Sequence, residues 1–302
     1  MLVPYHVTGG FCCMSVCITA RFRGLSSTGL KFLALALMIL DHIHYFFGYT
    51  GAIPLWFSQA GRLSAPLFLF CTVEGFAHTH DRRRYFLRIW AISAGMGLLQ
   101  FLMMYAHLGV RPDGFFPMNA IFMNFVILIP VWQGIDWLRQ RRWFRGLAAV
   151  VLPLAWPFVF LVLYGAANTT DLAWLLDSVL AALVYTVLPC WSLIVDGGGF
   201  FIATGIALYL LRNRRIPQAL VYGALTMVFY FAFPLIQLMG TPGFTASQML
   251  TLAYEWMGVF AMIPMLLYNG QRGRGCKALF YIVYPAHVYL LYALSWAVMA
   301  LR

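Results

Sequence analysis

The chain has 302 residues, of which 63% are hydrophobic and only 10% are charged, and its mean hydropathy is +0.81. A soluble domain of this length cannot bury so many apolar residues, so that class is excluded. The apolar runs are continuous over about 20 residues, which also excludes a membrane β-barrel. We therefore predict an all-α polytopic membrane protein, a bundle of about nine or ten transmembrane segments with a buried polar cavity.

The net charge of +11 is concentrated in short connecting segments. The basic residues cluster in 21–23, 82–88, 139–145, 212–215 and 272–277. Such clusters are typical of cytoplasmic loops, and they suit anionic lipid headgroups. Membrane lipid is thus the partner that the charge predicts, and no nucleic acid is needed to explain it.

Two parts of unequal size are expected. Residues 1–29 form an N-terminal cytoplasmic or interfacial arm, and residues 30–302 form a single transmembrane domain. The stretch 3–20 has no basic start and is interrupted by Gly9 and Gly10, so it makes a poor signal peptide. The six cysteines show no zinc-binding spacing, and no metal is predicted.

Continuous apolar segments give the expected spans. They are 30–48, 54–78, 86–107, 117–138, 146–165, 172–190, 196–211, 217–238, 251–269 and 278–300. The distribution of basic residues predicts an inner (plasma) membrane protein with a cytoplasmic N-terminus.

A conflict arises in the second half of the chain. If 172–190 and 196–211 both cross fully, the basic residues of 212–215 lie outside. A re-entrant or half-length 172–195, with Asp177, Pro189 and the triple glycine of Asp196-Gly-Gly-Gly199 as breakers, removes the conflict. We prefer nine crossings with one re-entrant piece, and ten crossings remain the alternative.

The first span contains the most informative residues, Asp41 and His42. A charged side chain at hydrocarbon depth costs roughly 2–3 kcal/mol or more, so it needs a partner and marks a functional site. At about 1.5 Å per residue, His42, Arg62 and His287 all reach a similar depth on three different helices. Arg62 is expected to pair with Asp41, and His42, beside that carboxylate, has the setting of a general base.

A second polar layer is expected at the cytoplasmic rim. Lys31 lies eleven residues before His42 and therefore on nearly the same helix face. The other members of this layer are Glu74, His78, Arg82, Arg83 and Arg84. An electropositive entrance that leads to a buried imidazole suits an anionic cosubstrate with several phosphates.

These residues carry a family resemblance. Their order resembles the TraX family in four segments: Lys31 with Asp41-His42, Gly61-Arg62-Leu-Ser-Ala-Pro-Leu-Phe68, Glu74-Gly-Phe-Ala-His78, and Phe280-Tyr-Ile-Val-Tyr-Pro-Ala-His287. The founding members of that family are required for amino-terminal acetylation of conjugative F-type pilin. The spacing of Lys31 and His42 also resembles a motif of membrane acyltransferases that acetylate cell-surface sugars.

The resemblance implies a chemistry. Acetyl-CoA from the cytoplasm is the implied acyl donor, with His42 as the catalytic residue and Lys31 on the donor side. Arg62, Glu74 and His287 are the implied site partners. The chain departs from many of the glycan-modifying enzymes because Asp41 precedes the histidine.

Three functions stay open on the sequence. The first is an integral membrane acyltransferase with a pilin amine or a glycan hydroxyl as acceptor, acting by direct transfer or through an acyl-His42 intermediate. The second is a proton-coupled transporter or exporter in which Asp41, His42, Arg62 and His287 form a relay. The third is a non-catalytic membrane assembly factor.

Overall fold

A computed structural model describes residues 24–167, 173–273 and 277–301. Most of the predicted N-terminal arm lies outside the described residues. The described part is built of helices and contains no strand, which confirms the all-α prediction.

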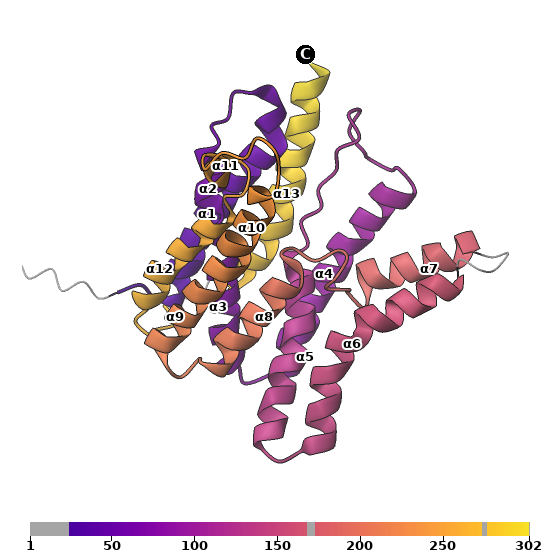
Figure 1. Cartoon of the computed structure of the whole chain (residues 1–302). Coiled ribbons are helices and arrows are strands. Elements are labelled where there is room, and N and C mark those ends of the chain that lie inside the picture. Colours follow the sequence, from indigo (N-terminus) through magenta and orange to yellow (C-terminus); the bar gives the residue numbers. More distant parts are fainter. Residues whose placement is uncertain (1–23, 168–172, 274–276, 302) are drawn as a thin grey trace, which may run out of the picture.

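The helices follow one another in an order close to the predicted spans (Figure 1). They are α1 (Ser27–Phe47), η1 (Gly48–Thr50), α2 (Trp56–Gly61), α3 (Ser64–Ala77), α4 (Arg82–Tyr105), α5 (Ile121–Arg139), α6 (Trp143–Ala167), α7 (Ala173–Thr186), α8 (Gly198–Leu210), α9 (Arg215–Met227), the π-helix η2 (Val228–Ala232), α10 (Phe233–Met239), α11 (Gln248–Thr251), η3 (Glu255–Ala261), α12 (Met262–Leu266) and α13 (Lys277–Ala300).

Six helical segments among the described residues are long and apolar enough to cross a membrane. They are Ser27–Thr50, Arg82–Tyr105, Ile121–Arg139, Trp143–Ala167, Arg215–Met239 and Leu279–Ala300. The chain is therefore a multi-pass membrane protein. The expected span 54–78 is divided into α2 and α3, because the helix breaks at Arg62 and Leu63.

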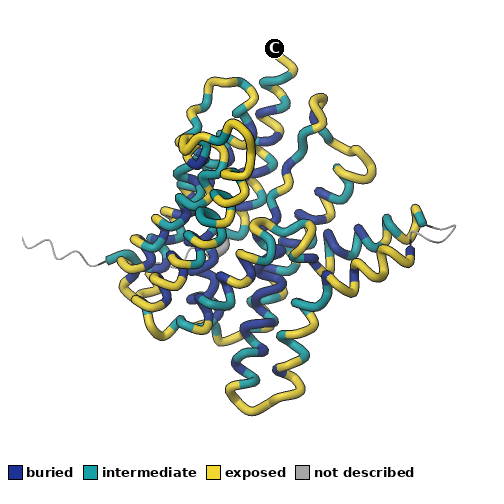
Figure 2. The backbone as a smooth tube through the Cα atoms, in the orientation of Figure 1, coloured by how far each residue is buried: buried dark blue, intermediate teal, exposed yellow. Residues whose placement is uncertain are grey.

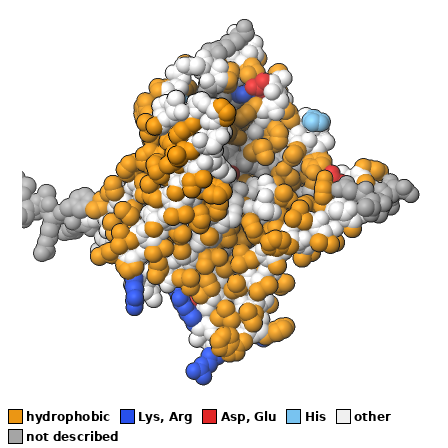
Figure 3. All heavy atoms as spheres, viewed as in Figure 1, with side chains coloured by type: hydrophobic (Ala, Val, Ile, Leu, Met, Phe, Trp, Pro, Cys, Tyr) orange, Lys and Arg blue, Asp and Glu red, His pale blue; other side chains and the backbone are white. Residues whose placement is uncertain are grey.

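Hydrophobic side chains cover most of the flanks of the molecule, as a lipid environment requires, while basic side chains gather at its lower end in Figure 3. We call this end, which carries Arg82, Arg83, Arg84, Arg212 and Arg215, the basic end, and ion pairs hold part of it together. Arg82 and Arg212 both bind Asp136, at 2.9 and 3.0 Å, and Arg215 lies 3.7 Å from Glu74. The start of α4, the end of α5 and the loop between α8 and α9 therefore lie together.

This arrangement bears on the number of crossings. Helix α6 leads away from the basic end, α7 packs back along it as a hairpin, and α8 returns to the basic end (Figure 1). With 14 and 13 residues, α7 and α8 are each only about 20 Å long, too short to cross about 30 Å of hydrocarbon. The geometry agrees with the half-length interpretation of 172–195.

The non-helical segment between α7 and α8 obtains hydrogen-bond partners from the surrounding protein. The indole Nε1 of Trp90 donates to the carbonyl of Val187, and that of Trp156 donates to the carbonyl of Leu188. Asn124 donates to the carbonyl of Asp196 at 2.9 Å. Irregular backbone at membrane depth is stable only where protein or water satisfies it, and here protein does.

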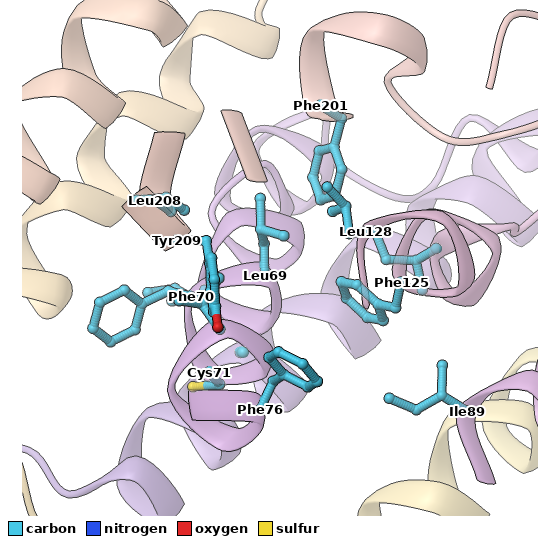
Figure 4. Packing of buried hydrophobic residues seen from close by; sticks show 14 of the residues in the cluster. Leu69, Phe70, Cys71, Phe76, Ile89, Phe125, Leu128, Phe201, Leu208 and Tyr209 are labelled. Carbon is cyan, nitrogen blue, oxygen red and sulfur yellow. The ribbon is translucent and has the colours of Figure 1, made fainter. Parts of the chain in front are cut away.

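The core lies around α3, which is packed between α1, α5 and α8 (Figure 2). Apolar side chains of α3 meet those of α5 and α8, as Figure 4 shows for Leu69, Phe76, Phe125, Leu128, Phe201 and Tyr209. The rings of Trp132 and Tyr209 stack with centroids 5.3 Å apart. This core holds α1 and α3 rigidly, and the candidate site is built on α1 and the helix break before α3.

Candidate functional site

A cavity of about 440 Å³ lies inside the bundle, within the size range of small-molecule sites. Its walls come from α1, α3, α8, α9, η2, η3 and α13, from the break between α2 and α3, from the segments before α5 and α8, and from the start of α5. Its polar lining side chains are Asp41, His42, Tyr45, Arg62, Ser64, Asn119, Asp196, Thr204, Tyr222, Thr226, Tyr230, Glu255 and Tyr284.

His42 is buried on α1 and is held from two sides. Its Nδ1 lies 2.6 Å from Nε2 of His287 on α13, and the two rings stack with centroids 4.8 Å apart. Its Nε2 lies 2.9 Å from Nδ2 of Asn119. Nδ1 of His287 donates to the carbonyl of Val283 at 2.7 Å.

Asp41 and Arg62 form an ion pair at 2.5 Å beside these histidines. The hydroxyl of Ser58 donates to the same carboxylate oxygen at 2.8 Å, and Nε of Arg62 donates to the Ser58 carbonyl at 3.1 Å. Gly61 makes the approach possible, since a Cβ there would lie 2.3 Å from Cβ of Asp41. The helix break at Arg62 turns the guanidinium toward α1.

Thus the structure brings together the four residues expected at one depth, but in two pairs. Adjacent residues on a helix point about 100° apart, so Asp41 faces α2 while His42 faces α13. A carboxylate, Asp41 or another one nearby, was the expected partner of His42, but Asp41 accepts from Ser58 and Arg62. The ring is held by His287 and Asn119 instead.

Sequence reasoning did not identify Asn119 and Asp196 as site residues. Asp196 was considered only as a helix breaker, yet its Oδ2 accepts from the backbone N–H of Ala120 at 2.9 Å and its side chain lines the cavity. The free-energy cost of placing a carboxylate at membrane depth, which drew attention to Asp41, applies equally to Asp196 and could have identified it. Asn119 lies in a connection between α4 and α5, where no periodic signal marks its direction.

A buried arginine anchors the connection that carries Asn119. Nη1 of Arg111 donates to the carbonyl of Phe46 and to the hydroxyl of Ser295, and its backbone N–H donates to the Tyr292 hydroxyl. The Arg111 guanidinium also binds Asp113, and these hydrogen bonds lower the pKa of that carboxyl. This anchor joins the connection to α1 and α13, which carry the two histidines.

The residues predicted for the donor side lie elsewhere, and none of them lines the cavity. Glu74 is buried beside Arg215, and the Nδ1 of His78 donates to the Glu74 carbonyl. Lys31 lies 5.9 Å from the ring centre of Phe280, about 16 Å below His42 along α1.

The three arginines of this set lie near the basic end. Arg82 is engaged with Asp136 and Gln133, and Arg84 pairs with Asp81. Arg82 and Arg83 line a separate pocket of about 250 Å³. Across the described ranges no group of three His, Cys, Asp or Glu side chains is placed to hold a metal ion.

Comparison with known proteins gives one match. A family profile described as TraX protein matches residues 26–195, which is more than half of the chain. The matched range contains Asp41, His42, Arg62 and Asn119, whereas His287 lies beyond it. No curated protein and no solved structure matches the chain.

Proposed function

Because the chain belongs to the TraX family, we propose that it is an integral membrane acyltransferase that uses cytoplasmic acetyl-CoA. The acceptor is an amine or hydroxyl of the cell envelope, such as a pilin amino terminus or a surface glycan. The protein resides in the inner membrane with its N-terminus in the cytoplasm, since the basic end then faces the side that holds the donor.

One observation carries the proposal. His42 is an imidazole inside the bundle, beside a cavity large enough for a small substrate, and its ring nitrogens contact His287 and Asn119 instead of a carboxylate. A buried histidine that served only to join helices would need no cavity. General bases in enzymes are most often histidines in this kind of setting.

The reaction follows from these groups. The acceptor X–H attacks the thioester carbonyl while His42 takes its proton. The X–C bond forms and the C–S bond breaks, and the proton passes from His42 to the departing sulfur, giving the acetylated acceptor and free CoA. Arg62 borders the same cavity and supplies a cation for the developing oxyanion.

The position of the acetyl-CoA phosphates is inferred from the positions of basic side chains. None of the ion pairs among the described residues involves Lys31 or Arg83, so both are available for phosphate groups. We assign the phosphates of acetyl-CoA to the basic end, near Lys31, Glu74, His78, Arg82, Arg83 and Arg84. The flexible arm of the coenzyme then reaches up toward His42.

The test is label transfer. Membranes that contain His42→Ala, supplied with radiolabelled acetyl-CoA, should transfer at least about 100-fold less acetyl group than wild type. His44→Ala is the matched control, because His44 is on the same helix and does not line the cavity. Undiminished transfer by His42→Ala at normal protein level overturns the proposal. Mass spectrometry of envelope glycans and proteins identifies the acceptor.

The transporter alternative makes a different demand. A relay through Asp41, His42, Arg62 and His287 needs a continuous chain of contacts, whereas the hydrogen bonds join these residues as two separate pairs. Acetyl-CoA should raise the thermal midpoint of an acyltransferase by mass action and leave that of a transporter unchanged.

A further inference from the structure

The hydrogen-bond partners of His42 and His287 determine which ring nitrogen of each histidine carries a hydrogen. A carbonyl oxygen can only accept, so the Nδ1 of His287 that lies 2.7 Å from the Val283 carbonyl must carry a hydrogen. The other nitrogen of His287, Nε2, lies 2.6 Å from Nδ1 of His42. One of these two nitrogens donates.

His287 cannot be the donor without becoming a cation. A second proton would make it an imidazolium whose hydrogen-bond partners, the Val283 carbonyl and the His42 ring, include no carboxylate. A buried cation without such a partner is costly. His287 is therefore neutral, its Nε2 accepts, and the shared hydrogen belongs to Nδ1 of His42.

It follows that Nε2 of His42 carries no hydrogen and has a lone pair that can accept one. The Asn119 amide agrees, because its Nδ2 donates to this nitrogen at 2.9 Å. The two partners differ in position. Asn119 lines the cavity and His287 does not, so Nε2 of His42 faces the cavity side and Nδ1 faces away from it.

We propose that His287 is a positioning residue that holds His42 in the Nδ1–H form, so that Nε2 is the nitrogen that takes the acceptor proton. The inference rests on the proposed function and goes beyond it. An isolated histidine prefers the opposite form, with hydrogen on Nε2, which would leave no base toward the cavity. The hydrogen bond made by one ring nitrogen decides the state of the other.

The assignment bears on two other roles in the proposed reaction. Both nitrogens of His287 are engaged, so it has no hydrogen left for an oxyanion, and Arg62 is the remaining candidate. When His42 takes a proton on Nε2, its Nδ1–H bond to His287 becomes charge-assisted and stronger. Asn119 occupies the position of the acceptor X–H in the resting site and must yield when the acceptor enters.

Nitrogen NMR of the full chain in lipid nanodiscs, with histidine ¹⁵N-labelled, tests the proposal without any activity. Single His→Gln variants assign the seven histidines. We expect wild-type His42 to show a protonated Nδ1 and an unprotonated Nε2, and His287→Ala to move the hydrogen to Nε2. A wild-type His42 with its hydrogen on Nε2, or a tautomer unchanged in His287→Ala, overturns the proposal.

Kinetics give the second readout. In His287→Gln the side-chain oxygen can still accept from Nδ1–H, so kcat should stay within about threefold of wild type. His287→Leu cannot accept, and kcat should fall at least tenfold with little change in KM for acetyl-CoA. Equal losses in both variants, at equal thermal midpoints, contradict the positioning role. The proposed function itself fails only if His42→Ala keeps full transfer, so the two failures are distinguishable.

Discussion

Two groups of polar residues lie at different depths of the bundle, and they differ in the space beside them. The central group lines the cavity of about 440 Å³, whereas at the basic end Arg82 borders a smaller pocket of about 250 Å³ and Asp136 borders neither. At the basic end, Asp136 accepts from Arg82, Arg212 and the Tyr209 hydroxyl, which closes the network on itself. In the central group, Asp41, His42 and Arg62 also have partners, yet each lines the cavity of about 440 Å³. Burial of charge alone therefore does not mark chemistry. The cavity beside the central group is what supports the proposed acyl transfer there.

The two groups should also differ in what they contribute, stability at the basic end and acetyl transfer in the centre. Arg82 and Arg212 both bind Asp136, so these three residues join the start of α4, the end of α5 and the segment after α8. The central group combines one ion pair with neutral imidazoles and an amide. Substitutions in the two groups should consequently affect stability and transfer in different proportions.

The largest effect is expected from Arg62→Met. It leaves the half-buried Asp41 carboxylate without its cation and should lower the free energy of unfolding by about 3 kcal/mol, the lower end of the range for breaking one side of a buried pair. The stability is measured by denaturant titration in detergent micelles.

The matched variant is Asp41→Leu combined with Arg62→Met. It should recover most of the lost stability, because an apolar pair of similar volume carries no unpaired charge. Acetyl transfer should stay low. Recovery of transfer together with stability would show that the ion pair is only structural, and would remove Arg62 from the chemistry.

Gly61→Ala should follow, with a loss of about 2 kcal/mol from overpacking. The added Cβ collides with Cβ of Asp41, which must move away from Arg62. Gly95→Ala in α4 is the control, because nothing lies within 4 Å of a Cβ there. Thermal midpoints of the two variants are compared, and equal midpoints would mean that the close approach of α1 and α2 is dispensable.

Asp136→Asn tests the basic end and should cost about 1.5 kcal/mol, because the amide loses the charge that pairs with Arg82 and Arg212 but keeps one oxygen that can accept from them. At saturating acetyl-CoA, kcat per folded molecule should equal that of wild type, because Asp136 does not line the cavity, while KM for acetyl-CoA can change because Asp136 holds Arg82. The thermal midpoint and kcat are measured on the same preparation. A drop in kcat at unchanged midpoint would contradict the division into two groups.

The smallest effect on stability is expected from Arg83→Gln. The side chain is exposed and lies in no ion pair within the described ranges, so the thermal midpoint should not change. If Arg83 holds a donor phosphate, KM for acetyl-CoA should rise several-fold. Arg145→Gln, at the exposed start of α6, is the control. Equal KM values in both variants would remove Arg83 from the donor site.

Sequence alone accounts for much of the architecture and for the depth of the central group. Hydropathy placed the helices, and counting residues from each membrane face placed His42, Arg62 and His287 in one layer. Depth does not fix the rotation of a helix about its axis. For that reason the pairing of His42 with His287, and not with Asp41, required the structure.

The segments that connect the helices were the other part of the structure that the sequence could not predict. Asn119 and Arg111 lie in the segment between α4 and α5, where neither a period of 3.6 residues nor a hydropathy peak indicates direction. The break between α2 and α3 was also hidden, because 54–78 is apolar throughout and Gly61 gives no clear stop signal. Contacts between distant segments decide such positions.

The segment between α7 and α8 has a consequence for biosynthesis. Its carbonyls depend on Trp90 of α4, Asn124 of α5 and Trp156 of α6, all of which precede it in the chain. A ribosome therefore delivers the donors before it delivers the segment that needs them. The short helices α7 and α8 can therefore insert beside α4, α5 and α6, which are already in the bilayer. Loss of any of these donors should first reduce the insertion of newly made protein.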